Sequence, residues 1–122
     1  MRKTYDEKAL CNRLKDYIVT HRHYRELDLS RNRTAKELGI PKAYISRVMK
    51  EQFGCSFSDY VNRYRIEYAH CLLSSPAHID NTIEEIAILS GFSCRMSLYR
   101  AYKKYFGSPL PKRTGSPDTM RI

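Results

Sequence analysis

An internal repeat is the feature that most restricts how this chain can fold. Residues 44–54 read YISRVMKEQFG and residues 97–107 read SLYRAYKKYFG, with equivalent positions 53 residues apart throughout. Arginine, lysine, phenylalanine and glycine recur at the same places, and apolar positions correspond as well, for example Ile45 and Leu98. Such a repeat indicates one structural unit built twice, so both copies need the same local fold.

The spacing of apolar residues predicts an all-α protein of about seven helices. We expect a first helix with Leu10, Leu14, Tyr17, Ile18 and His21 on one face, ending near His23. Further helices are expected over 30–39, 41–53, 56–75, 82–90 and 94–107, followed by a short turn after Pro109 and Pro111.

Capping signals set most of these boundaries. Ser30, Ser56 and Thr82 each precede a helical pattern as N-caps, although a capping box at Thr34 and Glu37 is an alternative start for the second helix. Four glycines are expected to end helices: Gly39, Gly54, Gly91 and Gly107.

The repeat extends beyond the matching eleven residues. Each copy has a short helix, a turn that contains Gly39 or Gly91, and a longer helix, which is the pattern of a helix-turn-helix. The second turn is one residue longer than the first. The expected organisation is residues 1–54 as the first helix and first helix-turn-helix, 55–76 as a linker helix, 77–113 as the second helix-turn-helix, and 114–122 as a flexible tail.

The long helix of each unit has an apolar and a polar face. The inner faces are expected to be core, with the members Ile45, Val48, Met49, Gln52 or Phe53, and Leu98, Ala101, Tyr102 and Tyr105. The outer faces correspond position by position: Lys42, Ala43, Ser46, Arg47 and Lys50 in the first unit, and Arg95, Met96, Tyr99, Arg100 and Lys103 in the second. A solvated basic face would also give this pattern, but it would not explain the duplication.

Charge indicates the class of partner. The chain carries 22 Lys and Arg against 13 Asp and Glu, and six basic residues without an acid lie between Arg95 and Arg113. This excess favours double-stranded DNA, and an anionic membrane surface or a protein partner is the alternative. A major groove admits one α-helix, and arginine can bind guanine through two hydrogen bonds.

Other classes of function find little support in the sequence. No run of about 18 apolar residues is present to span a bilayer, and the first ten residues lack the apolar segment of a signal peptide. The four cysteines are widely spaced, which indicates reduced thiols rather than a metal site or disulfides. No phosphate-binding glycine loop or catalytic motif is present, so we expect neither an enzyme nor a cofactor.

The second unit, IEEIAILSGFSCRMSLYRAYKKYFGSP at 83–109, resembles the DNA-binding domain of AraC/XylS-type bacterial transcription regulators. The segment FSDYVNRYRIEYAHCLL at 57–73 resembles the linker helix of that family, and the resemblance covers about residues 5–113. It implies two helix-turn-helix subdomains with recognition helices at 42–53 and 95–106. One departure is Lys112, which stands where the family has an aromatic residue.

The resemblance also implies roles for individual residues. Base-reading positions fall on Ala43, Ser46, Arg47, Arg95, Met96, Tyr99 and Arg100. We expect phosphate contacts from Lys42, Lys50, Lys103 and Lys104. By analogy with the family, the chain is a cytoplasmic activator that also contacts RNA polymerase. Most members join this domain to a sensor, so an excised domain is favoured over a stand-alone regulator.

Overall fold

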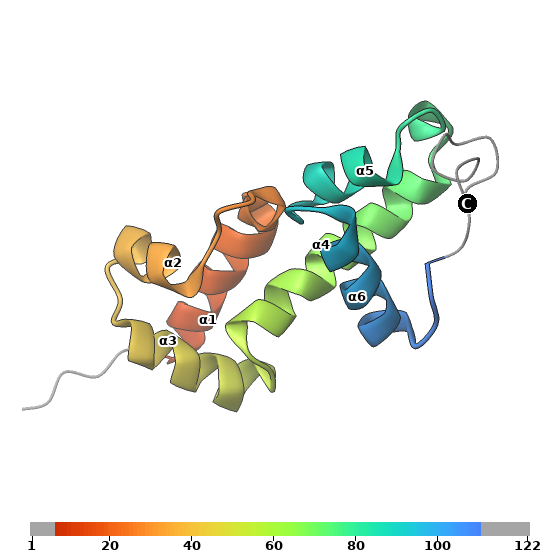
Figure 1. The fold of residues 1–122 in the computed structure, drawn as a ribbon. Helices are drawn as coiled ribbons and strands as arrows, with labels where there is room; N and C mark the ends of the chain where they lie inside the picture. The colour runs from red at the N-terminus through yellow and green to blue at the C-terminus, as the bar shows by residue number, and fades with distance from the viewer. Residues whose placement is uncertain (1–6, 111–122) are drawn as a thin grey trace, which may run out of the picture.

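The structure, a computed structural model, describes residues 7–110, which form six α-helices and no strand (Figure 1). The helices are α1 (Glu7–Lys15), α2 (Arg31–Leu38), α3 (Lys42–Val48), α4 (Phe57–Ser74), α5 (Ile83–Ser90) and α6 (Arg95–Phe106). The all-α fold is therefore confirmed. The turn expected after Pro111, Lys112 and the expected tail 114–122 lie outside the described residues. No helix within 7–110 is both long and apolar enough to cross a bilayer.

The first helix continues beyond α1 as a π-helical turn, Asp16–Thr20, and so ends close to the predicted position. Its buried side chains include Leu10, Leu14 and Ile18. His21 was expected on the same face, but it is exposed. The reason is that the chain leaves the helix after Thr20 and passes through a left-handed residue, Arg22, at φ 61°.

The N-terminus of α2 is capped by Ser30, whose hydroxyl accepts a hydrogen bond from the Arg33 amide at 3.0 Å. The alternative start at Thr34 is wrong. Thr34 is fully buried inside the helix, and its hydroxyl donates to the Ser30 carbonyl at 2.8 Å. The helix ends at Gly39, which adopts φ 67°.

Ion pairs hold the polar helix α2 in place. The Arg33 guanidinium contacts three carboxylates, those of Glu26, Asp28 and Glu37. Glu37 also accepts a hydrogen bond from the Tyr17 hydroxyl. Burial of the Tyr17 phenol, reinforced by this bond, raises its pKa to about 12. Ion pairs with Glu26 and Asp28, which precede α2, and the hydrogen bond to Tyr17 thus take the place of the apolar residues that anchor the equivalent helix in the second unit.

Helix α3 continues through a π-helical turn, Met49–Phe53, and ends at Gly54, as predicted. Ile45, Val48 and Met49 are fully buried, which confirms the inner face. Of the two candidates for its last position, Phe53 packs against Tyr60 with ring centroids 4.8 Å apart, whereas Gln52 is exposed.

Helix α4 connects two hydrophobic clusters, the first around Ile45 and Met49 and the second around Ile86 and Leu98. It runs from the α1–α3 group to α5 and α6 (Figure 1). Its N-terminal half places Phe57, Tyr60 and Val61 in the first cluster, and Tyr68 packs against both. The helical spacing of apolar residues predicts one buried stripe, made of Phe57, Tyr60, Val61, Tyr64, Tyr68 and Leu72. That stripe misses Ile66 and Ala69, which are fully buried in the second cluster. The buried face changes along α4 because the two clusters lie on different sides of the helix.

Helices α5 and α6 form the second unit on the distal half of α4. The predicted capping box is present: the Thr82 hydroxyl accepts from the Glu85 amide, and the Glu85 carboxylate accepts from the Thr82 amide. Leu98 and Tyr102 are buried as expected, but Tyr105 is 43% exposed. Its hydroxyl reaches outward to the Glu67 carboxylate on α4, at 2.7 Å, so Tyr105 lies at the rim of the core.

Candidate nucleic-acid interface

The outer face of α3 is accessible. Lys42, Ala43, Arg47 and Lys50 are exposed, whereas Ser46 is half-buried. The Ser46 hydroxyl accepts a hydrogen bond from the guanidinium of Arg31. A base contact by Ser46 would therefore share this hydroxyl with Arg31.

Arg31 is a cation of this surface that the sequence did not single out as a DNA contact. It is the first residue of α2 and is exposed, at the position where the second unit buries Ile83. Arg31 and Lys50 line a groove of about 400 Å³ at the C-terminal end of α3, whose other lining residues are Ser46, Gly54, Cys55, Ser56 and Phe57. No acid is among these residues, so the groove suits an anion. The polar residue at a position that is apolar in the other copy was the available signal.

Arg47 is held by neighbours within the chain. Its guanidinium lies 3.6 Å from the Glu7 carboxylate of α1 and 4.0 Å from Glu51, and it lies over the Tyr44 ring at 4.5 Å from the centroid. Glu7 is itself fixed by a hydrogen bond from the Gln52 amide at 2.9 Å. Each exposed ion pair contributes only about 0.2–1 kcal/mol, so these contacts orient Arg47 without preventing its release to another partner.

The outer face of α6 is also accessible, and Arg95, Met96, Arg100 and Lys103 are exposed. Met96 has 53% of its surface exposed, so its side chain is accessible to a partner. Tyr99 differs from the expectation of a fully outward residue, because it is half-buried and packs against the second cluster. Only part of its ring can therefore meet a partner.

The N-terminus of α6 is fixed by two polar groups. The Arg95 amide donates to the Glu84 carboxylate of α5 at 3.0 Å, so α5 supplies a cap to the following helix. The Cys94 thiol lies 3.6 Å from the Ser97 hydroxyl. Hydrogen bonding from the Ser97 backbone amide lowers the pKa of this thiol. These contacts set the angle at which α6 projects from the second unit.

Lys104, also expected to contact phosphate, is highly exposed and lies 3.3 Å from the Asp59 carboxylate on α4. Taken together, the outer faces present equivalent exposed cations at three pairs of positions: Lys42 with Arg95, Arg47 with Arg100, and Lys50 with Lys103.

Residues 7–110 contain no group of three or more His, Cys, Asp or Glu side chains that could hold a metal ion. All four cysteines are free thiols.

Comparison with known proteins gives this arrangement a family. A family model described as "Helix-turn-helix domain" matches residues 34–113. An uncharacterized HTH-type transcriptional regulator of Staphylococcus aureus strain MSSA476 is 33% identical over 108 residues, which are 88% of this chain and 13% of the relative. The chain thus spans about an eighth of the length of that relative.

Solved structures agree with the fold. The C-terminal domain of AraT, a response regulator from Geobacillus stearothermophilus, is 30% identical with a TM-score of 0.69, covering 80% of this chain and 77% of that one. The DNA-binding domain of the transcriptional factor AdpA, solved with a target DNA, has a TM-score of 0.66 at 18% identity and 86% coverage of both chains. The chain belongs to the AraC-type family of helix-turn-helix DNA-binding domains.

Proposed function

We propose that this chain reads double-stranded DNA by placing α3 and α6 in successive major grooves, as the DNA-binding part of a transcription regulator. The observation that carries the proposal is the correspondence between the exposed cations of α3 and α6. Equivalent positions in both helices are basic and accessible, although charge at these positions adds nothing to either core. A basic surface for membranes would need the charge but not its repetition at the same positions of two helices.

The length of α4 supports simultaneous reading. Its 18 residues extend about 27 Å at roughly 1.5 Å per residue. Successive major grooves on one side of B-DNA lie about 34 Å apart. A helix of this length, with one unit at each half, provides a separation of the right order.

We assign different tasks to the two units. In the first, Arg47 is the principal base reader, because Ala43 is small and Ser46 is bonded to Arg31. In the second, Arg95 and Arg100 are candidate guanine readers, and Met96 and the accessible part of Tyr99 suit thymine methyl groups. The phosphate contacts are assigned to exposed cations at the margins of the two faces: Arg31, Lys42, Lys50, Lys103 and Lys104.

The surrounding regulator is also part of the proposal. The chain covers 13% of its Staphylococcus aureus relative, which supports a place within a longer protein that carries a sensor or effector domain. By analogy with the family, the protein acts in the cytoplasm, and its expected mode of action is activation through contact with RNA polymerase. Co-purification with polymerase on a promoter fragment tests that contact separately from DNA binding.

Selection of bound sites from random duplexes tests the reading mechanism, because it gives the base preferences and the spacing of half-sites together. We expect two separated half-sites and a slope of log K against log salt near −5, if about six phosphates are neutralised. Arg47→Ala and Arg100→Ala should each relax one half-site, by about 1–3 kcal/mol for a bidentate contact.

Lysine variants serve as the comparison. Lys50→Ala and Lys103→Ala should weaken all sequences alike and reduce the salt slope by about one. Lys15→Ala, which removes an exposed charge of α1 outside both outer faces, is the control for net charge. If both arginine variants leave every base preference intact, the arginines hold only phosphates. If wild-type protein selects no sequence, the proposed function fails.

A further inference from the structure

The two helix-turn-helix units meet at a polar junction in the middle of α4. Arg65 of α4 donates from Nε to the carbonyl of Tyr24, at 2.6 Å, and from Nη2 to the carbonyl of Glu26, at 2.8 Å. Both carbonyls belong to the segment that includes the 3-10 turn His23–Arg25, between the first helix and α2. Arg65 therefore ties the linker helix to the body of the first unit through two bonds to its backbone.

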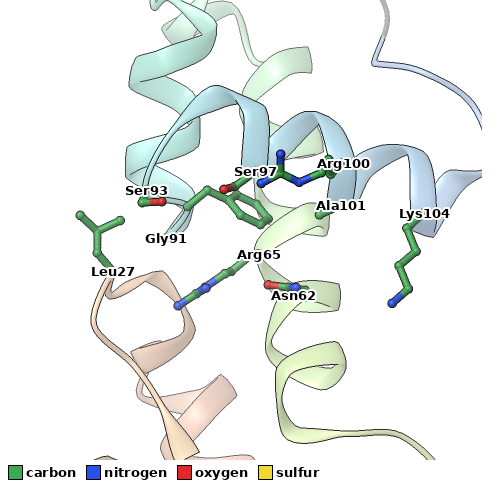
Figure 2. Close-up of a pocket in the computed structure, with 10 residues that line it drawn as sticks. Leu27, Asn62, Arg65, Gly91, Ser93, Ser97, Arg100, Ala101 and Lys104 are labelled. Atoms are coloured by element: carbon green, nitrogen blue, oxygen red, sulfur yellow. The ribbon is translucent and has the colours of Figure 1, made fainter.

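The second unit touches the same point. Gly91, in the turn between α5 and α6, is buried, and a Cβ placed on it would lie 2.5 Å from the Tyr24 carbonyl oxygen and 2.7 Å from Arg65 Nε. Arg65 also lies against the neighbouring Phe92 ring, with its guanidinium carbon 5.9 Å from the centroid. Figure 2 shows Arg65 between Gly91 of the second unit and the segment of the first unit that carries Leu27.

An aromatic residue of α4 also contributes to this junction. The ring of Tyr68, which packs against both clusters, receives the Arg25 guanidinium at 3.7 Å. On the other side a cleft of about 360 Å³ opens among Leu27 and residues of α4 and α6 (Figure 2). Side chains do not fill this space, so on this side the bonds of Arg65 and the close approach of Gly91 are the contacts that join the units.

We propose that Arg65 is a positioning residue that fixes the second unit against the first, and thereby sets the half-site spacing that the chain accepts. The inference rests on the proposed function, because it concerns how two DNA-reading units are held together. A rigid pair of units binds two half-sites with little loss of freedom, but only at one separation. A pair joined by α4 alone would tolerate several separations and bind each of them less tightly.

The planar guanidinium suits this role. Its N–H groups point in fixed directions, so two bonds define both a distance and an angle between α4 and the first unit. Burial lowers the pKa of Arg65, which reflects the partial loss of water around it. Replacing Arg65 by methionine keeps much of the volume, but leaves the carbonyls of Tyr24 and Glu26 without this donor.

The test compares wild type with Arg65→Met on duplexes whose half-sites, obtained by selection, are separated by the preferred spacing or by one base pair more or less. One base pair rotates a half-site by about 34–36°. We expect wild type to lose at least about tenfold in affinity off the preferred spacing. The variant should lose less than about threefold and bind the preferred duplex more weakly.

Arg63→Met is the matched control, since Arg63 is on the same helix, is 56% exposed and contacts Glu67 at 3.7 Å rather than the junction. It should retain the wild-type spacing profile. Residual dipolar couplings, measured without DNA, give an independent readout. One alignment tensor should fit both units in wild type and in Arg63→Met, and two should be needed in Arg65→Met. If Arg65→Met does not fold, Arg65→Lys, which keeps the charge but lacks the fork, is judged by the same criteria.

The outcomes separate the two ideas. A wild-type protein that binds no duplex would remove the proposed function, but the dipolar couplings would still test the junction. A wild-type protein with a sharp spacing preference that Arg65→Met retains would overturn the inference and leave DNA binding in place. If Arg63→Met also tolerated changed half-site spacings, the broadening would be due to the loss of a positive charge. That result would also overturn the inference about Arg65.

Discussion

Substitution of Gly91 by alanine tests whether the second unit presses against the first. Gly91 and Gly39 occupy equivalent places in the repeat, and both lie in the left-handed region, at φ 103° and φ 67°. A Cβ at Gly39 would meet nothing within 4 Å, whereas at Gly91 it would lie 2.5 Å from the Tyr24 carbonyl oxygen. Gly39→Ala is therefore a matched control that shares the backbone strain but not the collision.

The expected magnitudes differ enough to measure. Alanine in a left-handed conformation costs about 1–2 kcal/mol, and the reduced freedom of the unfolded chain offsets about 0.4–1 kcal/mol of that. Gly39→Ala should thus lower the free energy of unfolding by about 1 kcal/mol. At Gly91 the collision adds about 1–3 kcal/mol, as in overpacked cores, because the nearest atom is backbone and cannot rotate away.

Urea unfolding followed by circular dichroism at 222 nm is a suitable assay, since the chain has no tryptophan. We expect Gly91→Ala to lose about 2 kcal/mol more than Gly39→Ala, or roughly 6–12 °C more in melting temperature. Equal losses in the two variants, within about 0.5 kcal/mol, would refute the close approach of the α5–α6 turn to the Tyr24 carbonyl.

Three further predictions follow from other contacts. Insertion of one alanine after Asn62, between Val61 of the first cluster and Ile66 of the second, rotates the second unit by about 100° and moves it by about 1.5 Å. Duplex affinity should therefore fall in a gel-shift assay while helical content remains. Unchanged affinity would show that the units read DNA independently. Glu7→Gln should raise duplex affinity by about two- to fivefold in fluorescence anisotropy, because Arg47 loses one competing carboxylate. Glu67→Gln is the control, since Glu67 is distant from Arg47 in sequence and on another helix, and it should leave the affinity unchanged. The hydrogen bond from the Thr82 amide lowers the pKa of Glu85, so this contact stabilises the fold above the ordinary carboxyl pKa and is lost as pH falls through the lowered pKa. Glu85→Gln should therefore make the melting temperature fall less steeply between pH 5 and 3. An unaltered slope in this variant would contradict the prediction.

Local signals allowed most helix boundaries to be predicted. Helix caps act within one turn of the residues they affect, as the N-caps Ser30, Ser56 and Thr82 and the final glycines do. A short stretch of sequence is therefore enough to predict them. The alternative helix start at Thr34 was wrong because a threonine hydroxyl can bond in two ways. It can cap a helix by accepting from a backbone amide, or it can donate to a backbone carbonyl inside a helix. In a helix interior it bonds the carbonyl four residues earlier, and only the observed start at Ser30 leaves Thr34 in that interior.

Features that depend on distant segments could not be predicted in the same way. Helix α4 changes its buried face between Val61 and Ile66 because it serves two clusters, and a single periodic stripe cannot express that change. Arg65 bonds to backbone carbonyls 39 and 41 positions away, and a carbonyl has no sequence signature. The sequence predicted the exposed faces of α3 and α6, but it did not predict which side chains contact them, for example Arg31, which bonds to Ser46.

The two units share a pattern of charge but differ in how that charge is held. In the first unit Arg47 lies among Glu7, Glu51 and Tyr44, so it is already oriented and must leave carboxylates to reach a base. In the second unit Arg100 lines the open cleft beside the junction, and no carboxylate among residues 7–110 forms an ion pair with it. Ordering Arg100 therefore takes more conformational entropy on binding but breaks no ion pair. Because palindromic operators mirror a two-fold axis in the protein, and these units are neither identical nor equally restrained, the site expected for one chain is asymmetric, with half-sites that differ in sequence and in sensitivity to salt.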